Sequence, residues 1–300
     1  MIIIKMIKKI TSIDDLSIKD INKIADDAIK FSLNKKKTKK SKVRNIFNLF
    51  LEPSTRTTVS FELAAKKIGH NIININFDKS SLSKGETFKD TMATLVSMNP
   101  DALIIRDQRE FSPRDIYNNH KISVINAGDG KNEHPTQSLL DYAILKKKFG
   151  NKKITIGICG DIKHSRVAHS NIKLFTKLNY NIELIAPDYF LDKNNLLKIN
   201  KNIKYRNSLN NIDNLDVIMM LRIQKERINK NLKSSVASFK NKYCLNMKHL
   251  KSKPFLMHPG PVNRNIEISD DVLDSYKRSL ILDQVEMGVY TRMACLEYLF

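Results

Sequence analysis

The sequence predicts an α/β protein in which two mostly parallel β-sheets are flanked by helices. Short runs rich in Ile, Val and Leu alternate along the chain with stretches whose apolar residues recur at helical spacing. Eight such runs fall into two sets of four, separated by one helical stretch. Three hundred residues with 41% apolar content are enough to build two domains with buried cores.

The expected strands are short, β-branched and bounded by polar or turn-forming residues. Their ranges are 43–50, 72–75, 102–105 and 123–126 in the first set, then 154–159, 182–186, 217–221 and 255–257 in the second. The polar, Asn-rich residues 193–214 are expected to form a surface helix and loop.

The helical stretch between the two sets defines the expected domain boundary. Pro135 fits the first position of a helix, and Gly150 fits the residue just after its end. We therefore expect a first domain at residues 1–134, an interdomain helix at 135–150 and a second domain at 151–284. Residues 285–300 carry apolar residues at helical spacing and are expected to pack back on the first domain.

The composition predicts a cytoplasmic protein that contains no membrane segment. Lysines interrupt the apolar start of the chain, and no apolar run reaches the roughly 18 residues of a spanning helix. Three cysteines without a CxxC pair argue against a disulfide framework and against a zinc site, so we expect no metal.

The formal net charge of +21 makes nucleic-acid binding an alternative. The Lys runs are scattered among Asn and Ile without interleaved aromatics, which favours a solvated surface instead. Only 12 of the 52 basic residues are Arg. Because a guanidinium can hold phosphate or carboxylate with two parallel hydrogen bonds, each Arg is a candidate ligand-binding residue.

The first candidate segment, Ser54-Thr55-Arg56-Thr57, directly follows a predicted strand and opens a predicted helix. Hydroxyl and guanidinium donors then gather where free backbone N–H groups and the positive end of the helix dipole converge, which is typical of a phosphate site. The alternative is a Ser/Thr helix cap beside a surface Arg. The segment lacks the Gly-rich pattern of a nucleotide P-loop.

Three further segments of the first half are ambiguous when each is taken alone. The loop containing Ser81 and Lys84 could simply cap the next helix, and Arg106 could be surface charge at a strand end, although ligand sites of open α/β sheets lie there. His134 and Gln137 flank the start of the interdomain helix. They could donate to a carbonyl oxygen or could be capping residues.

The second half repeats the pattern of polar residues after apolar strands. Residues 156–170 resemble the first turn of a dinucleotide fold but lack G-x-G-x-x-G, which disfavours NAD. Arg222 comes directly after another strand. Residues 257–264 form a Pro-rich turn that can offer backbone carbonyls to a ligand.

Together and in this order, the segments resemble the aspartate/ornithine carbamoyltransferase family over residues 5–298. The S-T-R-T, H-P-T-Q and H-P-x-P motifs carry the resemblance, at residues 54–57, 134–137 and 258–261.

Within that family the chain is similar to the aspartate branch. Thr136 replaces the Cys that the ornithine enzymes have in the H-P-x-Q motif, and H-P-G-P replaces their H-C-L-P. Arg222-Ile223-Gln224 matches the aspartate-binding pattern. Thr58, where many relatives have a basic residue, and Gly260, where they have a larger apolar residue, depart from the pattern.

The resemblance implies transfer of a carbamoyl group from carbamoyl phosphate to the α-amine of L-aspartate, an early step of pyrimidine biosynthesis, without a cofactor. The implied phosphate ligands are Ser54, Thr55, Arg56, Thr57 and Arg106. The implied ligands of the carbamoyl oxygen are Thr57, Arg106 and His134, and those of the carbamoyl amino group are Gln137 and the backbone of Gly260 and Pro261. The implied aspartate ligands are Lys84, Arg166, Arg222 and Gln224.

The resemblance also implies a homotrimer, because Ser81 and Lys84 would reach a site in the neighbouring subunit. Because both substrates would be held across a crevice, the resemblance also implies domain closure when aspartate binds. The resemblance allows for a regulatory chain as a further partner. No nucleic-acid or membrane partner is expected. The alternatives are a carbamoyltransferase with another acceptor, such as ornithine, and a basic nucleic-acid-binding protein.

Overall fold

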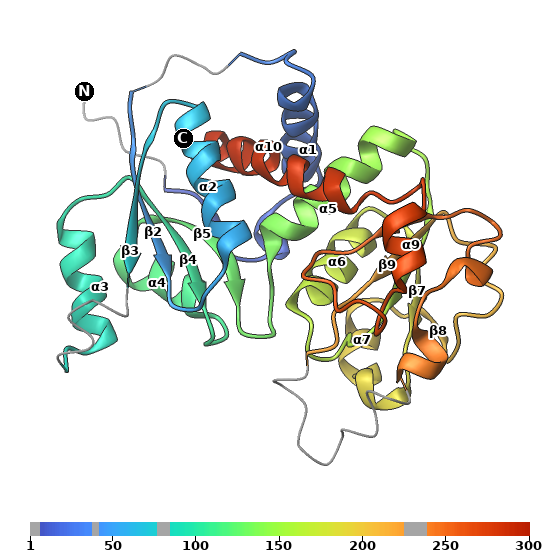
Figure 1. Ribbon diagram of the computed structural model, residues 1–300. Coiled ribbons are helices and arrows are strands. Elements are labelled where there is room, and N and C mark those ends of the chain that lie inside the picture. The colour runs from blue at the N-terminus through green and yellow to red at the C-terminus, as the bar shows by residue number, and fades with distance from the viewer. Residues whose placement is uncertain (1–6, 38–41, 77–84, 225–238) are drawn as a thin grey trace. The chain divides into compact units, whose positions relative to one another are not determined.

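The computed structural model describes residues 7–37, 42–76, 85–224 and 239–300, and the chain forms two compact units. Unit 1 comprises Met1–Lys147 and Val285–Phe300, and unit 2 comprises Lys148–Gln284. The boundaries therefore fall inside α5 (Pro135–Phe149) and inside α10 (Ile281–Leu299). Each unit has a β-sheet of its own with helices beside it (Figure 1).

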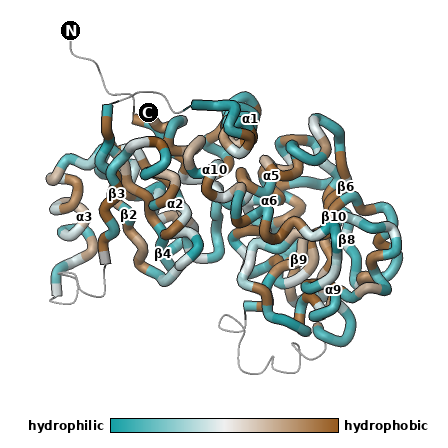
Figure 2. Tube along the Cα trace, turned by 45° about the horizontal axis from the view of Figure 1, so that its top comes forward, coloured by the Kyte–Doolittle hydropathy of each residue, from teal (hydrophilic) through white to brown (hydrophobic). Residues whose placement is uncertain are grey.

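Unit 1 contains a five-stranded parallel sheet with the order β1-β5-β4-β2-β3. The strands are β1 (Lys9–Ile10), β2 (Asn45–Phe50), β3 (Asn71–Asn76), β4 (Ala102–Asp107) and β5 (Ser123–Asp129). Strand β2 pairs with β3 on one side and with β4 on the other, so Ile46 lies opposite both Ile72 and Ala102. The apolar character of these strands is visible in Figure 2.

One apolar cluster of unit 1 joins the sheet to two helices, α3 (Phe88–Ser97) and α4 (Ser112–His120). Because successive strand residues point to opposite faces, alternate residues of β2 and β4 contribute to it. Its main members are Phe47, Leu49, Met92, Leu95, Leu103, Ile105, Ile116 and Val124.

Unit 1 also contains α1 (Ile18–Ser32), α2 (Thr55–Lys67), α5 up to residue 147 and the part of α10 beyond residue 284. A capping box of Ser17 and Asp20 fixes the start of α1. The C-terminal end of α10 contacts the N-terminal part of unit 1, since Lys8 Nζ donates to the Tyr298 carbonyl at 2.7 Å and Lys36 pairs with Glu297.

Unit 2 contains a second five-stranded parallel sheet, with the order β10-β9-β6-β7-β8. Its strands are β6 (Thr155–Cys159), β7 (Asn181–Ile185), β8 (Lys204–Arg206), β9 (Val217–Met220) and β10 (Phe255–Met257). Its described helices of six or more residues are α6 (Arg166–Lys177), α7 (Lys193–Ile199) and α9 (Asp270–Ser275).

The predicted fold class is confirmed, and each of the eight expected strands has a counterpart within three residues of the expected ends. The sequence prediction missed β1 and β8, each of which is one of the two edge strands of its sheet. Strand β1 has only two residues, and two of the three residues of β8 are basic, so neither shows an apolar run. The expected surface helix within residues 193–214 is α7, but that range also contains β8.

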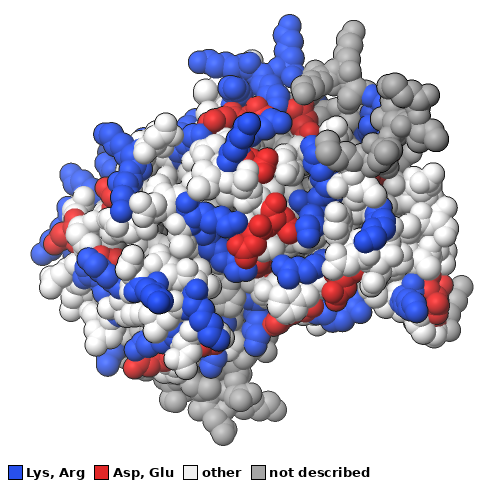
Figure 3. All heavy atoms as spheres, turned by 180° about the vertical axis from the view of Figure 1, so that it is seen from behind, with Lys and Arg blue, Asp and Glu red and all other residues white. Residues whose placement is uncertain are grey.

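No helix among the described residues is long and apolar enough to cross a membrane. Within the same residues, His, Cys, Asp and Glu form no group of three or more that could hold a metal ion. On the face shown in Figure 3, Lys and Arg are spread over the surface with Asp and Glu among them.

Candidate active site

Several of the predicted ligand residues follow the strands at which strand order reverses in each sheet. In unit 1, β2 lies between β3 and β4, so the loops after β2 and β4 are neighbours. In unit 2, β6 lies between β7 and β9, so the loops after β6 and β9 are neighbours. Ligands of open α/β sheets bind outside the carboxyl ends of the strands at these switch points.

The start of α2 has the features of an anion site. Ser54 occupies the N-cap position, yet its side chain makes no capping hydrogen bond, and the first turn contains no acidic residue. Thr57 is buried, whereas Thr55 and Arg56 are exposed. The simple capping role for Ser54 is therefore not observed, and the positive end of the helix dipole meets no carboxylate of its own first turn.

Arg106 lies beside this helix start because β4 pairs with β2. Its Nε is 2.7 Å from Glu52 Oε1, and its backbone carbonyl accepts from Leu51 N–H at 2.9 Å. Both side chains of the ion pair are largely buried. Arg106 is thus not the freely exposed charge that the alternative interpretation required. Glu52 holds its side chain near the carboxyl end of β4.

Asp107, the last residue of β4, is hydrogen-bonded to the residues that follow it. Asp107 accepts hydrogen bonds from Arg109 and from the Ser112 hydroxyl at 2.6 Å. Although burial opposes it, these bonds lower the pKa of Asp107. Asp107 therefore stays ionised and anchors the residues that follow Arg106.

Asp129 organises the turn that leads to His134. Its carboxylate accepts from Asn126 Nδ2, Asn132 Nδ2 and Glu133 N–H, each at 2.9 Å. Burial raises the pKa of Asp129, and these hydrogen bonds work against that rise. The Glu133 carboxylate accepts from the Ser12 hydroxyl at 2.6 Å, so the turn is held on both sides.

His134 and Gln137 are both buried at the start of α5. The His134 carbonyl accepts from Gln137 N–H at 3.0 Å, so the backbone of His134 takes part in the start of the helix. The His134 imidazole is not used for this hydrogen bond. Gln137 Nε2 donates to Asp141 Oδ1 at 3.0 Å. His134 and Gln137 therefore lie together at one helix terminus, with the donating end of the Gln137 carboxamide bound to Asp141.

In unit 2, the loop after β6 requires the glycine that follows Cys159. Gly160 has a φ of +135°, and a Cβ there would lie 2.8 Å from the Leu221 carbonyl oxygen. Fully buried Asp161 contacts His164 Nδ1 at 2.8 Å. The Ser165 hydroxyl accepts from Ala168 N–H at the start of α6, so Arg166 is the first residue of that helix.

The loop after β9 carries Arg222 and Gln224, both partly exposed. Gln224 Nε2 donates to the His164 carbonyl at 2.9 Å, which ties this loop to the loop after β6. The switch point of unit 2 therefore brings Gln224 to the segment that precedes Arg166.

The turn after β10 is tied to the loop after β9 by Glu267. Its Oε1 accepts from Ile223 N–H at 2.8 Å and from Asn263 Nδ2 at 2.7 Å, and its Oε2 accepts from Asn263 N–H at 2.8 Å. Burial raises the pKa of Glu267, and its hydrogen bonds oppose that rise. Within the turn, Gly260 N–H donates to His258 Nδ1 at 2.8 Å, and the Gly260–Pro261 bond is cis.

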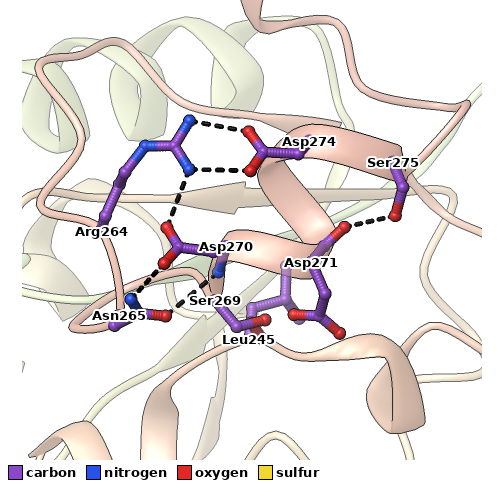
Figure 4. A network of polar contacts seen from close by, with 8 residues as sticks. All are labelled: Leu245, Arg264, Asn265, Ser269, Asp270, Asp271, Asp274 and Ser275. Atoms are coloured by element: carbon purple, nitrogen blue, oxygen red, sulfur yellow. Dashed lines mark hydrogen bonds and ion pairs between the residues drawn. The ribbon is translucent and has the colours of Figure 1, made fainter.

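Arg264, the last residue of the Pro-rich segment, is not part of this arrangement. Its exposed guanidinium binds Asp274 at 2.7 Å and Asp270 at 2.8 Å, while Asn265 also contacts Asp270 (Figure 4). Hydrogen bonds from Arg264 lower the pKa of both carboxyl groups. This network links the turn to the first turns of α9.

The predicted residues thus divide between the units: Ser54, Thr55, Arg56, Thr57, Arg106, His134 and Gln137 in unit 1, and Arg166, Arg222, Gln224, Gly260 and Pro261 in unit 2. Ser81 and Lys84 lie outside the described residues. The sequence analysis missed the carboxylates that position these residues: Glu52, Asp107, Asp129, Asp141, Asp161 and Glu267. Acidic residues that end or closely follow apolar strands were the available signal for most of them.

Comparison with protein families matches both halves of the chain. Residues 8–147 match the carbamoyl-P binding domain of aspartate/ornithine carbamoyltransferase, and residues 152–299 match the Asp/Orn binding domain of the same family. The two matches together span nearly all of the chain.

Individual proteins are similar over the same length. The aspartate carbamoyltransferase catalytic subunit of Pelagibacter ubique is 41% identical over 298 residues, covering 97% of this chain and 95% of the relative. That of Wolbachia pipientis is 42% identical over 301 residues, covering 97% and 98%.

Solved structures give the same result. Aspartate transcarbamoylase from Trypanosoma cruzi in complex with N-(phosphonacetyl)-L-aspartic acid has a TM-score of 0.86 at 31% identity, covering 96% of this chain and 94% of that one. The catalytic subunit of the M. jannaschii enzyme has a TM-score of 0.81 at 32% identity, covering 98% and 97%.

Proposed function

This chain belongs to the aspartate/ornithine carbamoyltransferase family, and from that premise we propose that it is an aspartate carbamoyltransferase. It transfers the carbamoyl group of carbamoyl phosphate to the α-amine of L-aspartate, giving N-carbamoyl-L-aspartate and phosphate, a step of pyrimidine biosynthesis. The observation that carries the proposal is what lies at the switch point of each sheet. The switch point of unit 1 has phosphate-binding features, and that of unit 2 is followed by Arg166, Arg222 and Gln224. Relatives above 40% identity bear the same activity in their names.

Unit 1 is proposed to bind carbamoyl phosphate. Ser54, Thr55, Arg56 and Thr57 surround the phosphate at the α2 terminus, joined by Arg106. The side chain of Ser54 makes no capping hydrogen bond, so its hydroxyl is available for a phosphate oxygen. A solved relative in complex with carbamoyl phosphate, from Trypanosoma cruzi, supports this substrate.

The resemblance to the family assigns donors and acceptors to the carbamoyl group. Thr57, Arg106 and His134 donate to its oxygen, while Gln137 and the backbone of Gly260 and Pro261 accept from its amino group. Fixed donors aimed at this oxygen stabilise the negative charge that develops when the carbonyl is attacked.

Unit 2 is proposed to bind L-aspartate. Arg166 and Arg222 bind its two carboxylates with Gln224, and Lys84 adds a third cation. The Gln224 hydrogen bond to His164 and the Glu267 contact to Ile223 fix residues 223 and 224, which reduces the entropy that they lose on binding.

The reaction follows from these charges. The neutral α-amine attacks the carbamoyl carbon, a C–N bond forms, and charge gathers on the carbamoyl oxygen before the C–O bond to phosphate breaks. The departing phosphate takes the amine proton, so no covalent enzyme intermediate is needed. His134 acts as a donor to the oxygen and not as the base.

We propose that the active unit is a cytoplasmic homotrimer with shared sites. Ser81 and Lys84 lie in the connection that follows the edge strand β3, and Ile73 on β3 is 45% exposed. Val59 and Leu63 on α2 are also large exposed apolar residues, and a neighbouring subunit would cover such a surface. The free cysteines Cys159, Cys244 and Cys295 suit a reducing compartment.

Subunit mixing tests the shared site. Lys84→Ala and Arg56→Ala should each be inactive alone, yet mixed trimers should regain partial activity because some sites contain neither lesion. Demonstrated subunit exchange without recovery would refute the sharing.

Product analysis tests the acceptor. Purified protein is incubated with carbamoyl phosphate and equal concentrations of L-aspartate or L-ornithine, and carbamoyl-aspartate and citrulline are quantified. We expect aspartate to react at least about a hundredfold faster, because ornithine brings a cation to a site lined by cations. Comparable rates would overturn the aspartate assignment and leave carbamoyl transfer standing.

A further inference from the structure

Asp141 is a buried carboxylate for which the proposed reaction has no direct use. It lies on α5 one turn after Gln137, within unit 1, and it is fully buried. Gln137 Nε2 donates to Asp141 Oδ1 at 3.0 Å. Burying an ionised carboxylate is costly unless it is paired and hydrogen-bonded, so its position calls for a compensating partner and a role.

The chemistry of Asp141 determines the orientation of the Gln137 carboxamide. An ionised carboxylate can only accept hydrogen bonds, whereas a carboxamide has one donating and one accepting end. The Nε2 end must therefore face Asp141, and the Oε1 end of the planar group faces away from it. Gln137 is thereby fixed as an acceptor for an N–H donor of a ligand.

A second buried charged group, Arg292 on α10, also belongs to unit 1, and the carboxylate of Asp141 acts on its pKa. Arg292 is 4% exposed, its Nη1 donates to the Gly288 carbonyl at 3.0 Å, and its guanidinium lies 5.0 Å from the Phe61 ring centroid. Burial lowers the pKa of Arg292 to about 10, and the charges of Cys295 and Asp141 oppose that fall. Arg292 thus remains a cation at neutral pH.

Gly288 provides the space that this guanidinium needs. A Cβ at residue 288 would lie 2.7 Å from Arg292 Nη1, on the side where α10 approaches Leu140 of α5. The two helices are therefore packed so that the Arg292 guanidinium is enclosed beside Gly288.

We propose that Asp141 is a positioning residue for carbamoyl phosphate, which holds Gln137 so that its Oε1 accepts from the carbamoyl amino group. The inference rests on the proposed function, since it names how that site selects its donor substrate. It assigns to Asp141 the discrimination between a carbamoyl and an acetyl group, because a methyl group cannot donate a hydrogen bond.

The test compares the affinities of carbamoyl phosphate and acetyl phosphate for the full chain without an acceptor, by titration calorimetry. Asp141→Asn retains the shape but offers Gln137 a donor or an acceptor, so the carboxamide is no longer fixed. We expect the preference for carbamoyl phosphate to fall about tenfold, the equivalent of one hydrogen bond, in Asp141→Asn and in Gln137→Ala. Acetyl phosphate affinity should change little.

Two further variants keep the test decisive. Asp141→Leu with Arg292→Met removes both buried charges at similar volume, so it avoids an uncompensated cation and should show the same loss of preference. Glu183→Gln is the matched control, because Glu183 is a buried carboxylate of unit 2 that pairs with Arg206. The control should keep the wild-type preference.

The outcomes separate this inference from the proposed function. An unchanged preference in folded Asp141→Asn or in the double variant, with the preference lost in Gln137→Ala, overturns the role of Asp141. Failure of both Asp141 variants to fold also overturns it, because Asp141 would then serve the stability of the fold. Wild-type protein that prefers carbamoyl phosphate but forms no carbamoyl-aspartate would refute the aspartate assignment instead.

Discussion

Replacing Glu267 by Gln should weaken L-aspartate binding without affecting the binding of carbamoyl phosphate. Glu267 does not belong to the predicted ligand set, but its carboxylate holds Ile223 N–H and both nitrogens of Asn263. Ile223 lies between Arg222 and Gln224. The substitution is nearly isosteric, so its effect reports hydrogen bonding and not volume.

The magnitude follows from the three hydrogen bonds. Gln has one accepting oxygen and one donating nitrogen, so the less costly orientation keeps the two bonds to Oε1 and turns its NH2 toward Asn263 N–H. An unsatisfied buried donor costs about 1–3 kcal/mol. Burial raises the pKa of Glu267, so a neutral amide recovers part of the desolvation cost, and we expect a net loss of about 1–2 kcal/mol of stability.

The assay combines denaturant unfolding with steady-state kinetics for both substrates. A loop that is looser by about 1.4 kcal/mol corresponds to about a tenfold rise in the KM for aspartate, with the KM for carbamoyl phosphate unchanged. Glu183→Gln removes another buried carboxylate of unit 2, on β7, two strands away from β9, and should lower stability while leaving both KM values unchanged. Equal rises in the two KM values for Glu267→Gln, or a wild-type KM for aspartate in a destabilised protein, would refute the reasoning.

Three further predictions use the same measurements. Arg56→Ala should lower turnover by at least about a hundredfold, because the exposed Arg56 at the α2 terminus is proposed to bind phosphate. The circular dichroism spectrum should not change. Activity within tenfold of wild type would remove Arg56 from the site. Arg222→Ala should raise the aspartate KM by an amount that corresponds to a loss of about 2–5 kcal/mol of binding free energy. The affinity for carbamoyl phosphate, measured by calorimetry, should not change. Because the folded-state pKa of Asp107 is lowered from 3.8, its contribution to stability is present above that value and is lost as pH falls through the folded-state pKa. Asp107→Asn should therefore flatten the acid side of the stability curve, which unfolding titrations below about pH 5 would reveal; an unchanged acid limb would contradict the assignment.

The parallel sheets could be predicted because most buried strands produce apolar runs, and eight of the ten described strands were located from such runs. The edge strands β1 and β8 could not be predicted, since β1 has only two residues, two of the three residues of β8 are basic, and the pairing of each depends on a neighbour, β5 or β7. The same limit applies to Gly160, whose glycine requirement comes from the Leu221 carbonyl 61 residues later.

The sequence by itself determined the fold class and the identity of the candidate ligand residues. Hydrophobic periodicity is local, and the Arg, Ser, Thr and His residues of the motifs lie within a few residues of each strand end. Only the tertiary structure decided which carboxylate holds which of these groups. Glu52 meets Arg106, Glu267 meets Ile223, and Asp141 shares its surroundings with Arg292, across 54, 44 and 151 residues of sequence. Such pairings depend on the strand order and on helix packing, which set the distances between side chains that no sequence spacing encodes.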